Sequence, residues 1–429
     1  MTTSTALHHL TASEAARKIA AGEITSEALV RACLERIEER EAVVRAWAFL
    51  DPELALAEAR ERDRRKPAGP LHGVPIGVKD VIETSDLPTE YGSPIYRGHR
   101  PARDAACVAR ARVAGAVILG KTASTEFAYI QPAPTRNPLN TAHTPGGSSS
   151  GSTAAVADRM IPLALGTQTG GSTIRPAAYC GNFGFKPTFN RVGVAGVKPL
   201  SVSFDTVGMI GRSVDDMALL DAALTGASAL RPGAERRRAL RIGYCETPFW
   251  NEAEDSTRRA LADAAEALQS AGARIREVML PEEMRELSDG HPEVVKHEAA
   301  FTLRREYAEH PDGLSSFARE AVEAGLAMAA DDMQRVRRVQ TLCSVAVDRL
   351  VSPLDALLTP TAPGEPEVGD AIGNNVFNRI WTAMHMPCLT IPSSTGPNGM
   401  PVGVQLIGRA GRDRALLGAG RRVAAVLLA

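Results

Sequence analysis

The chain has 429 residues, of which 44% are hydrophobic and 23% are charged. This is the composition of an ordinary globular protein, and the length allows one large α/β domain or two average domains. The 49 lysines and arginines are balanced by 50 aspartates and glutamates. Near neutrality argues against a general nucleic-acid-binding or membrane-binding surface, because such a surface needs an excess of basic residues.

The lack of a recognisable secretion signal, together with the cysteine usage, favours a cytoplasmic protein. Residues 1–10 do not show the positive stretch followed by an apolar run that marks a secretion signal. No apolar run reaches the ~18 residues that cross a membrane. The six cysteines lie far apart without a C-x-x-C pair, which is typical of free thiols in a reducing compartment. The arginine runs at 236–238 and 335–338 are expected to be solvated faces.

The first elements along the chain are helical. Residues 11–40 carry an apolar stripe at helical spacing, with Thr11 or Ser13 as the first cap and Thr25 or Ser26 as the second. The charged stretch 59–66, which ends at prolines and glycines, is expected to be an entry loop. Short buried strands are predicted at 74–78 and 116–119, with a helix at 108–114 between them.

Strands and helices alternate in the second half of the chain. A strand at 240–243, a helix through 261–268 and a strand at 275–280 indicate an α/β sheet with covering helices. Charged helical sequence at 292–350 is followed by predicted strands at 357–361, 388–392 and 402–407. The segments 286–350 and 364–377 are expected to shape a pocket.

Two loops rich in glycine and hydroxyl groups stand out between residues 141 and 211. One is Gly146-Gly147-Ser148-Ser149-Ser150-Gly151-Ser152 and the other Gly166-Thr167-Gln168-Thr169-Gly170-Gly171-Ser172. Nucleophilic acyl transfer needs a hydroxyl, a proton acceptor and backbone N–H groups close to an oxyanion. Glycine permits that close approach because it has no Cβ, and Lys79 offers a base.

Two familiar motifs fit parts of this sequence but are disfavoured. Residues 115–122 match G-x-x-x-x-G-K-[ST], yet the middle residues Ala, Val, Ile and Leu belong in a buried strand rather than around a phosphate. Residues 147–151 match the G-x-S-x-G elbow with Ser149 as nucleophile. The acid (Asp205 or Asp355) and histidine (His385) that this elbow needs have no distinctive context, and no apolar strand leads into it.

A third interpretation accounts for the whole pattern. The stretches 73–80, 114–122, 137–138, the two serine loops, 180–181, 184–188, 204–208, 359–363 and 401–405 resemble, in the correct order, the amidase signature family. The resemblance runs from about Leu71 to the C-terminus and is closest to the malonamidase-like branch. Most members have an aspartate where Gln168 stands, and an arginine two residues after the nucleophile rather than three.

The resemblance implies a catalytic role for three residues. Ser172 corresponds to the nucleophile, Ser148 to a bridging serine after a cis peptide bond from Gly147, and Lys79 to the base. Thr169, Gly170 and Gly171 would form the oxyanion hole with backbone N–H groups, and Thr167 would brace the loop. Because the ordinary pKa of lysine is near ~10.4, Lys79 can act only if burial keeps it neutral.

Arg175 is the main indication of the substrate. A guanidinium beside an acyl-transfer site can bind a carboxylate through two hydrogen bonds, and malonamidase-like relatives are expected to hold a small carboxylate-bearing amide in this way. The alternative is a structural pair with an acid such as Asp205. His143 is assigned a structural hydrogen bond, since Lys79 already supplies the base.

These observations together predict a single α/β/α sandwich domain with a large central mixed β-sheet covered by helices. Within residues 1–429 we expect a helical layer (1–66), a catalytic core (71–215), a variable helical region (240–350) and a sheet-completing segment (351–429). The expected function is hydrolysis of a small amide through an acyl-enzyme, without metal or cofactor, by a cytoplasmic protein that is a homodimer. The alternatives are a carbamate or ester hydrolase and a glutamine amidotransferase subunit that works with partner proteins.

Overall fold

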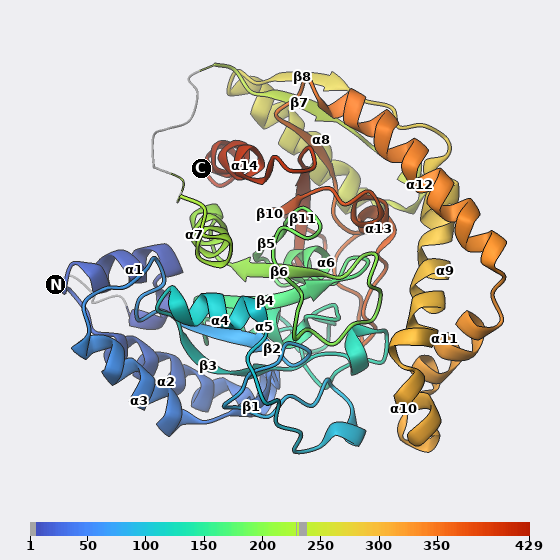
Figure 1. The fold of residues 1–429 in the computed structure, drawn as a ribbon. Helices are drawn as coiled ribbons and strands as arrows, with labels where there is room; N and C mark the ends of the chain where they lie inside the picture. Colours follow the sequence, from blue (N-terminus) through green and yellow to red (C-terminus); the bar gives the residue numbers. More distant parts are fainter. Residues whose placement is uncertain (1–5, 229, 231–237) are drawn as a thin grey trace.

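A mixed sheet of 11 strands runs through the molecule, and helices pack on both of its faces (Figure 1). The computed structural model describes residues 6–228, 230 and 238–429. The strands are β1 (Trp47–Leu50), β2 (Pro75–Lys79), β3 (Val117–Thr122), β4 (Leu163–Gln168), β5 (Phe183–Lys186), β6 (Thr206–Gly211), β7 (Arg241–Tyr244), β8 (Arg274–Glu277), β9 (Ala356–Pro360), β10 (Cys388–Thr395) and β11 (Pro401–Ile407). Their order across the sheet is β1-β3-β2-β4-β6-β5-β10-β11-β9-β7-β8, which confirms the predicted fold class.

Parallel pairing is confined to two groups of strands. β2 runs parallel to β3 and β4, and β7 runs parallel to β8 and β9, whereas the remaining neighbours are antiparallel. The carboxyl ends of parallel strands meet at the same edge of a sheet. Lys79 at the end of β2 and Gln168 at the end of β4 therefore lie at one edge, where both serine-rich loops begin or end.

The described residues form fourteen α-helices around this sheet. They are α1 (Ala12–Ala20), α2 (Ser26–Val44), α3 (Pro52–Arg64), α4 (Ala106–Val113), α5 (Ser150–Ala157), α6 (Ile174–Tyr179), α7 (Val214–Thr225), α8 (Asp255–Ser270), α9 (Met284–Thr302), α10 (Arg304–Glu309), α11 (Ser316–Leu326), α12 (Ala330–Val351), α13 (Val376–Ala383) and α14 (Asp413–Leu427). In Figure 1, α9–α12 form a layer along one side of the molecule, and α1–α3 lie at the opposite side.

Alternation along the strands divides the core into two clusters. Val117 and Leu119 of β3 face a smaller cluster with residues of α2, α3 and α5. Ile118, between them, faces the larger cluster, which includes residues of α4, α7 and α14. This alternation follows from the two-residue period of a strand, and it means that α2 and α3 pack against the face of β3 that carries Val117 and Leu119.

The helix ends follow the local sequence signals. Thr11 caps α1 in a capping box with Glu14, and the Thr25 hydroxyl caps α2 by accepting from Ala28 N. The prediction of an entry loop at 59–66 is wrong as far as Arg64, because α3 continues to that residue. Ala55, Leu56 and Ala59 form a narrow buried stripe on α3, which the many charged residues around it conceal in the sequence.

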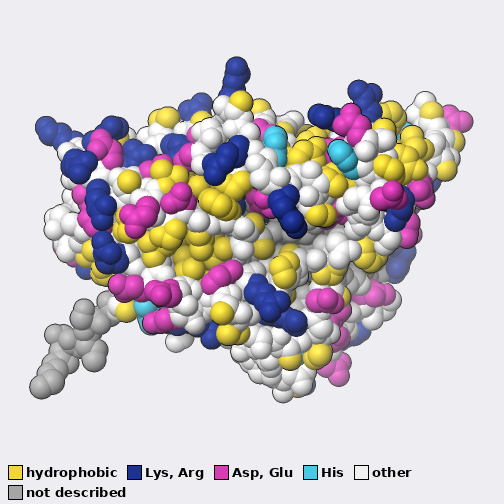
Figure 2. All heavy atoms as spheres, turned by 90° about the horizontal axis from the view of Figure 1, so that it is seen from below, with side chains coloured by type: hydrophobic (Ala, Val, Ile, Leu, Met, Phe, Trp, Pro, Cys, Tyr) yellow, Lys and Arg dark blue, Asp and Glu magenta, His cyan; other side chains and the backbone are white. Residues whose placement is uncertain are grey.

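The surface agrees with the balanced charge of the chain. On the face shown in Figure 2, basic and acidic side chains are interspersed, with hydrophobic side chains gathered among them. Arg335 on α12 pairs with Glu286 and Glu293 at the surface, as expected for a solvated face, whereas Arg236 and Arg237 lie outside the described residues. No helix in the described part of the chain is long and apolar enough to cross a membrane.

Asp158, the residue after α5, joins the end of that helix to α2. Its side chain is buried and pairs with Arg36 and Arg40, with Arg40 Nε 2.9 Å from Oδ2. We expect Asp158→Asn to lower the free energy of unfolding by about 1–3 kcal/mol, because it weakens charged hydrogen bonds at a buried acceptor. Urea unfolding would measure this. Arg31→Gln, which removes an exposed pair with Glu27, is the control and should change stability by less than ~0.5 kcal/mol.

Candidate active site

Lys79 is the last residue of β2, and its side chain is completely buried. Its Nζ lies 2.6 Å from Ser148 Oγ and 2.8 Å from Thr167 Oγ1. Thr167 reaches this position because β4 runs parallel to β2. The structure thus brings Lys79 and Ser148 into direct contact and places Thr167 against the lysine itself.

The environment of Lys79 favours the neutral amine. Burial lowers the pKa of Lys79 well below its ordinary value, and the charge of Asp205 opposes this shift only in part. Within the described residues no carboxylate forms an ion pair with Lys79. Lys121, also buried, differs in having Asp80 at 3.4 Å; burial lowers its pKa to about 8. Lys121 is thus paired with a carboxylate, whereas the partners of Lys79 are two hydroxyl groups.

The loop that carries Ser148 turns sharply against α6. Gly146 has φ +75°, and a Cβ at this position would lie 3.0 Å from Pro176 Cα. The peptide bond between Gly147 and Ser148 is cis, which confirms the geometry implied by the family resemblance. Arg175 Nη2 donates to the Gly147 carbonyl oxygen at 2.7 Å, so the arginine fixes the residue just before Ser148.

Ser172 is joined to the same segment through the backbone. Ser149 N donates to the Ser172 carbonyl oxygen at 3.2 Å, which aligns the two serine loops side by side. The structure shows no hydrogen bond between the Ser148 and Ser172 hydroxyl groups, both of which belong to the described residues. Of the three residues predicted to relay a proton, Lys79 and Ser148 are in contact, and Ser172 stands beside them on the adjoining loop.

The backbone between residues 169 and 172 has unused donors. Among the described residues, the N–H groups of Gly170 and Gly171 donate to no protein acceptor, as an oxyanion hole requires. A Cβ at Gly170 would lie 2.5 Å from Asn375 Nδ2, and one at Gly171 would lie 2.7 Å from Asn378 Oδ1. A side chain at Gly170 would therefore displace the amide end of Asn375, whereas one at Gly171 would also press on Asn375 Cβ, 2.9 Å away, because the start of α13 packs closely against this loop.

Neutral side chains hold this loop from behind. The Gln168 Oε1 accepts from Thr173 N and Ile174 N, at 2.9 and 3.0 Å, and so caps α6, while its Nε2 donates to Thr382 Oγ1. Thr382 Oγ1 in turn donates to the Gly170 carbonyl oxygen at 2.8 Å. Gln168 thus positions the loop through hydrogen bonds alone, without adding a negative charge beside Ser172.

Thr169 anchors the other side of the loop. Its hydroxyl donates to Asp205 Oδ1 at 2.6 Å, and its carbonyl oxygen lies 2.8 Å from Nε2 of the buried His291. Burial raises the pKa of Asp205 to about 6 and lowers that of His291 to about 4. Since Asp205 also accepts from Leu200 N, it is not the structural partner of Arg175 that the sequence offered as an alternative.

A cavity of about 210 Å³ opens at Ser172. Its lining residues are Ala128, Tyr129, Ile130, Thr169, Gly170, Ser172, Arg175, Leu200, His291, Pro292, Val295, Ile372, Asn375 and Arg379. Both segments expected to shape the pocket, 286–350 and 364–377, contribute to it. Arg175 and Arg379 are the charged members, and no aspartate or glutamate belongs to this described lining.

The guanidinium groups of the two cavity arginines are incompletely paired. Arg175 is buried, and its Nε has no hydrogen-bond partner among the described residues; burial lowers its pKa to about 10. Arg379 on α13 donates its Nε to Ser288 Oγ at 2.6 Å. Within the part of the chain that the structure describes, neither arginine forms an ion pair with a carboxylate, so both can receive an anionic group.

The residues of the two disfavoured motifs make structural hydrogen bonds. Lys121 lies in the buried strand β3 and donates to the Ile82 carbonyl oxygen at 2.7 Å. Ser149 Oγ is buried and donates to the Thr167 carbonyl oxygen at 3.1 Å. His385 lies 2.9 Å from the Ser203 carbonyl oxygen and stacks on Phe189, so it is engaged away from Ser149.

Other reactive groups are also engaged in structure. His143 Nδ1 lies 2.7 Å from the Pro366 carbonyl oxygen, in line with the structural role assigned to it. All six cysteines are buried and unpaired. No group of three or more metal-ligating side chains occurs in the ranges that the structure describes.

Three residues at this site could not be found from sequence motifs. His291, Asn375 and Arg379 come from α9 and the region of α13, far along the chain from the serine loops, and their spacing carries no signal. Asp205 is different, because it stands in the family-like stretch 204–208. Its link to the nucleophile loop through Thr169 could have been suspected there.

Comparison with known proteins places this geometry in a family. The family model described as Amidase matches residues 28–417. A glutamyl-tRNA(Gln) amidotransferase subunit of Chloroflexus aggregans is 34% identical over 97% of this chain and 96% of its own length. A solved structure of an amidase has a TM-score of 0.88 at 32% identity and covers 97% of this chain and 100% of its own.

A second solved structure is the peptide amidase from Stenotrophomonas maltophilia, with a TM-score of 0.84 at 30% identity, covering 98% of this chain and 97% of its own. These relatives do not single out the malonamidase-like branch. The match over residues 28–417 and the coverage of whole relatives nevertheless leave no ambiguity about the family. This chain belongs to the amidase signature family and is an enzyme that acts on carbon–nitrogen bonds.

Proposed function

We propose that the chain hydrolyses a small linear amide through an acyl-enzyme on Ser172. The observation that carries the proposal is the buried Lys79 amine, which contacts Ser148 at 2.6 Å without a paired carboxylate among the described residues. A lysine can accept a proton near neutral pH only when its charged form is disfavoured. Burial without a counter-ion provides this condition.

In the proposed reaction, neutral Lys79 takes the proton of Ser148 as Ser148 takes that of Ser172. The Ser172 oxygen attacks the amide carbonyl carbon, and the resulting oxyanion is received by the N–H groups of Gly170 and Gly171, with Thr169 completing the loop. Ser148 then passes a proton to the leaving nitrogen, which departs as ammonia or an amine, and Lys79 returns its proton to Ser148 and becomes neutral again. Water attacks the ester of Ser172 by the same route, and this step regenerates the free serine.

The cavity supports a small substrate with a negative charge. At about 210 Å³ it has room for few atoms, and its two arginines face no carboxylate within the described lining. Arg175 holds the Gly147 carbonyl with one nitrogen and retains others for substrate. We propose that Arg175 and Arg379 together bind a carboxylate, as in a malonamate-like amide.

The second candidate is an amidotransferase subunit that takes ammonia from glutamine and works with partner proteins rather than as a homodimer. The relatives named as subunits of a glutamyl-tRNA(Gln) amidotransferase, among them one that is 34% identical over 97% of this chain, favour it. Both candidates use the same cleavage of an amide by Ser172. They differ at the substrate, because glutamine carries an ammonium group that needs a carboxylate, and none lines the cavity among the described residues.

Acylation of Ser172 tests the shared chemistry. Mass spectrometry of protein quenched during turnover of a panel of amides, carbamates and esters should show the acyl group on the peptide that contains Ser172. Lys79→Met, which keeps the length and burial of the side chain, should lower kcat about 10²–10⁴-fold. Lys186→Met, at another buried lysine that donates to the Pro187 carbonyl oxygen, is the matched control and should retain most activity.

Ser149→Ala separates this mechanism from the elbow alternative, since Ser149 Oγ only braces Thr167. It should remain acylated at Ser172. Acylation at residue 149 in the unaltered protein, or full activity in Lys79→Met, would refute the proposal.

The pH dependence follows from the lowered pKa of Lys79. We expect kcat/KM to rise with pH as Lys79 loses its proton, with a midpoint below the ~10.4 of free lysine. The Asp205 charge raises the pKa of Lys79, and it is present above the pKa of Asp205, which is about 6. Asp205→Asn should therefore move the midpoint to lower pH.

A pH–rate profile of the two proteins distinguishes this effect from damage to the loop. Loosening of Thr169 alone would lower the rate at every pH and leave the midpoint in place. An unchanged or higher midpoint in Asp205→Asn contradicts the assignment of Lys79 as the base.

Substrate choice distinguishes the two candidate functions. The purified chain should hydrolyse malonamate faster than glutamine and faster than 3-methylbutanamide, which has a similar shape but no charge. Arg379→Ala should raise the KM for malonamate about tenfold or more and change the KM for the neutral amide little, because only malonamate loses a charged hydrogen bond. Arg175→Ala should also lower kcat on both, since Arg175 fixes Gly147 as well.

If Arg379→Ala raises the KM for malonamate and the KM for the neutral amide by the same factor, the proposal that the substrate carries a carboxylate is wrong. Glutamine as the preferred substrate, with ammonia release that requires a partner protein, would establish the amidotransferase instead.

A further inference from the structure

A second and larger cavity lies far along the sheet from Ser172. It measures about 590 Å³ and is enclosed by the start of β7, the turn between α12 and β9, the end of β11 and one side of α14. None of its lining residues belongs to the cavity at Ser172. Amide hydrolysis as described above makes no use of this second cavity.

Arginines are concentrated around this cavity. Six of them line it, namely Arg238, Arg241, Arg409, Arg412, Arg414 and Arg422, and the one carboxylate of the described lining is Asp355. The chain as a whole has a net charge of −1, so this accumulation is local and does not reflect a basic protein. Guanidinium groups gathered in one place repel each other unless anions compensate them.

The protein compensates only part of this charge. Arg238 and Arg241 both pair with Asp355; burial alone would raise the pKa of Asp355, but these hydrogen bonds lower it, so the carboxylate is ionised. Arg409 pairs with Asp348, outside the lining, at 2.6 Å.

The other arginines of the cavity lack a carboxylate among the described residues. Arg422 Nη2 donates to the carbonyl oxygen of Arg238 at 2.9 Å, and Arg414 donates to that of Ser228. Arg412 has no hydrogen bond or ion pair through its side chain in the part of the chain that the structure describes. Among the described residues, two carboxylates thus stand against six guanidinium groups, so the described lining retains a positive charge.

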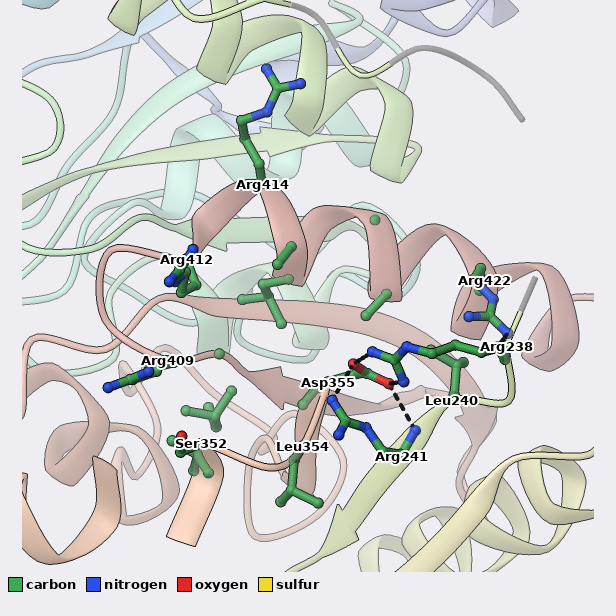
Figure 3. A pocket seen from close by; sticks show the side chains of 18 of the residues that line it. Arg238, Leu240, Arg241, Ser352, Leu354, Asp355, Arg409, Arg412, Arg414 and Arg422 are labelled. Atoms are coloured by element: carbon green, nitrogen blue, oxygen red, sulfur yellow. Dashed lines mark hydrogen bonds and ion pairs between the residues drawn. The ribbon is translucent and has the colours of Figure 1, made fainter. Parts of the chain in front are cut away.

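The arginines fall into two groups at opposite ends of an apolar floor (Figure 3). Arg238 and Arg241 meet Asp355 at one end, with Arg422 beside Arg238, and Arg409 and Arg412 lie at the other end, where the chain enters α14. Arg414 points away from both groups. The apolar floor is formed by the buried hydrophobic residues of the lining, which are Leu240, Val351, Ala356, Ile407, Leu416 and Ala419.

We propose that this cavity binds a small organic anion whose apolar body covers the floor and whose phosphate or carboxylate groups meet the arginines. Guanidinium groups bind both kinds of anion through paired hydrogen bonds. The volume lies within the range typical of small-molecule sites, about 300–1,000 Å³. The apolar floor favours an organic ligand over an inorganic ion, because only a ligand with an apolar body removes that surface from water.

Isothermal titration calorimetry of the full chain with three probes tests the proposal. ATP carries phosphates on a ring system, suberate carries carboxylates on an aliphatic chain, and inorganic phosphate has no apolar part. We expect saturable binding of ATP or suberate, whichever matches the natural anion group, with a Kd at least tenfold below that of inorganic phosphate. Raising the salt concentration should weaken this binding.

Single substitutions locate the binding in this cavity. Arg412→Gln and Arg422→Gln, one at each end, should each raise the Kd about tenfold. Arg421→Gln is on the same helix but lies outside the lining of this cavity and pairs with Asp215, so it is the matched control and should leave the Kd within about twofold. Circular dichroism and the thermal unfolding midpoint serve as the check that each variant is folded.

Three results would overturn the proposal. They are no saturable binding of ATP or suberate, binding of inorganic phosphate as tight as that of the organic anions, and equal Kd values in the Arg412 and Arg422 variants and the unaltered protein. Because binding is measured directly, these outcomes are independent of whether Ser172 acts on the amides proposed above.

Discussion

The burial of one amine without a counter-ion is the constraint on which this site depends. Moving a charged ammonium group into a protein interior costs several kcal/mol unless a carboxylate pairs with it. At Lys79 no carboxylate of the described residues is in contact, and two hydroxyl groups take its place. The neutral form is therefore the one compatible with the fold, and the neutral form is the one that can accept a proton.

The surrounding structure preserves this condition. Lys79 ends a strand whose neighbours on both sides are parallel, so its side chain is enclosed by the sheet edge and by both serine loops. The nucleophile loop is held by amide and hydroxyl groups, and its contact with an acid is through the Thr169 hydroxyl to Asp205. The carboxylate of Asp205 is thus separated from Lys79 by the uncharged nucleophile loop.

The strands and the serine loops could be predicted from the sequence because their signals are local. Buried strands at 74–78 and 116–119 follow from short apolar runs, and Thr11 and Thr25 from helix-cap chemistry. The charged surface of α3 conceals its buried stripe, so the local pattern there indicates a loop where the chain forms a helix.

For the cavity walls, the segments 286–350 and 364–377 could be predicted, but most of the individual residues could not, because they meet only in three dimensions. His291, Asn375 and Arg379 approach Ser172 through the packing of α9 and α13, and no spacing along the chain records this. Arg175 could be placed near the nucleophile from its position three residues later. Its contact with the Gly147 carbonyl oxygen could not, since that contact depends on how two loops fold against each other.

The origin of the cavity walls has an evolutionary consequence. The groups assigned to proton transfer are Lys79, Ser148 and Ser172, whereas six of the fourteen described residues that line the cavity come from a second stretch, 291–379. Mutations in the second stretch can remodel which compound is admitted while the hydroxyl–amine contact remains intact. In a scaffold divided in this way, substrate specificity can change while the reaction mechanism stays the same. Relatives with different names can therefore share one set of reactive groups.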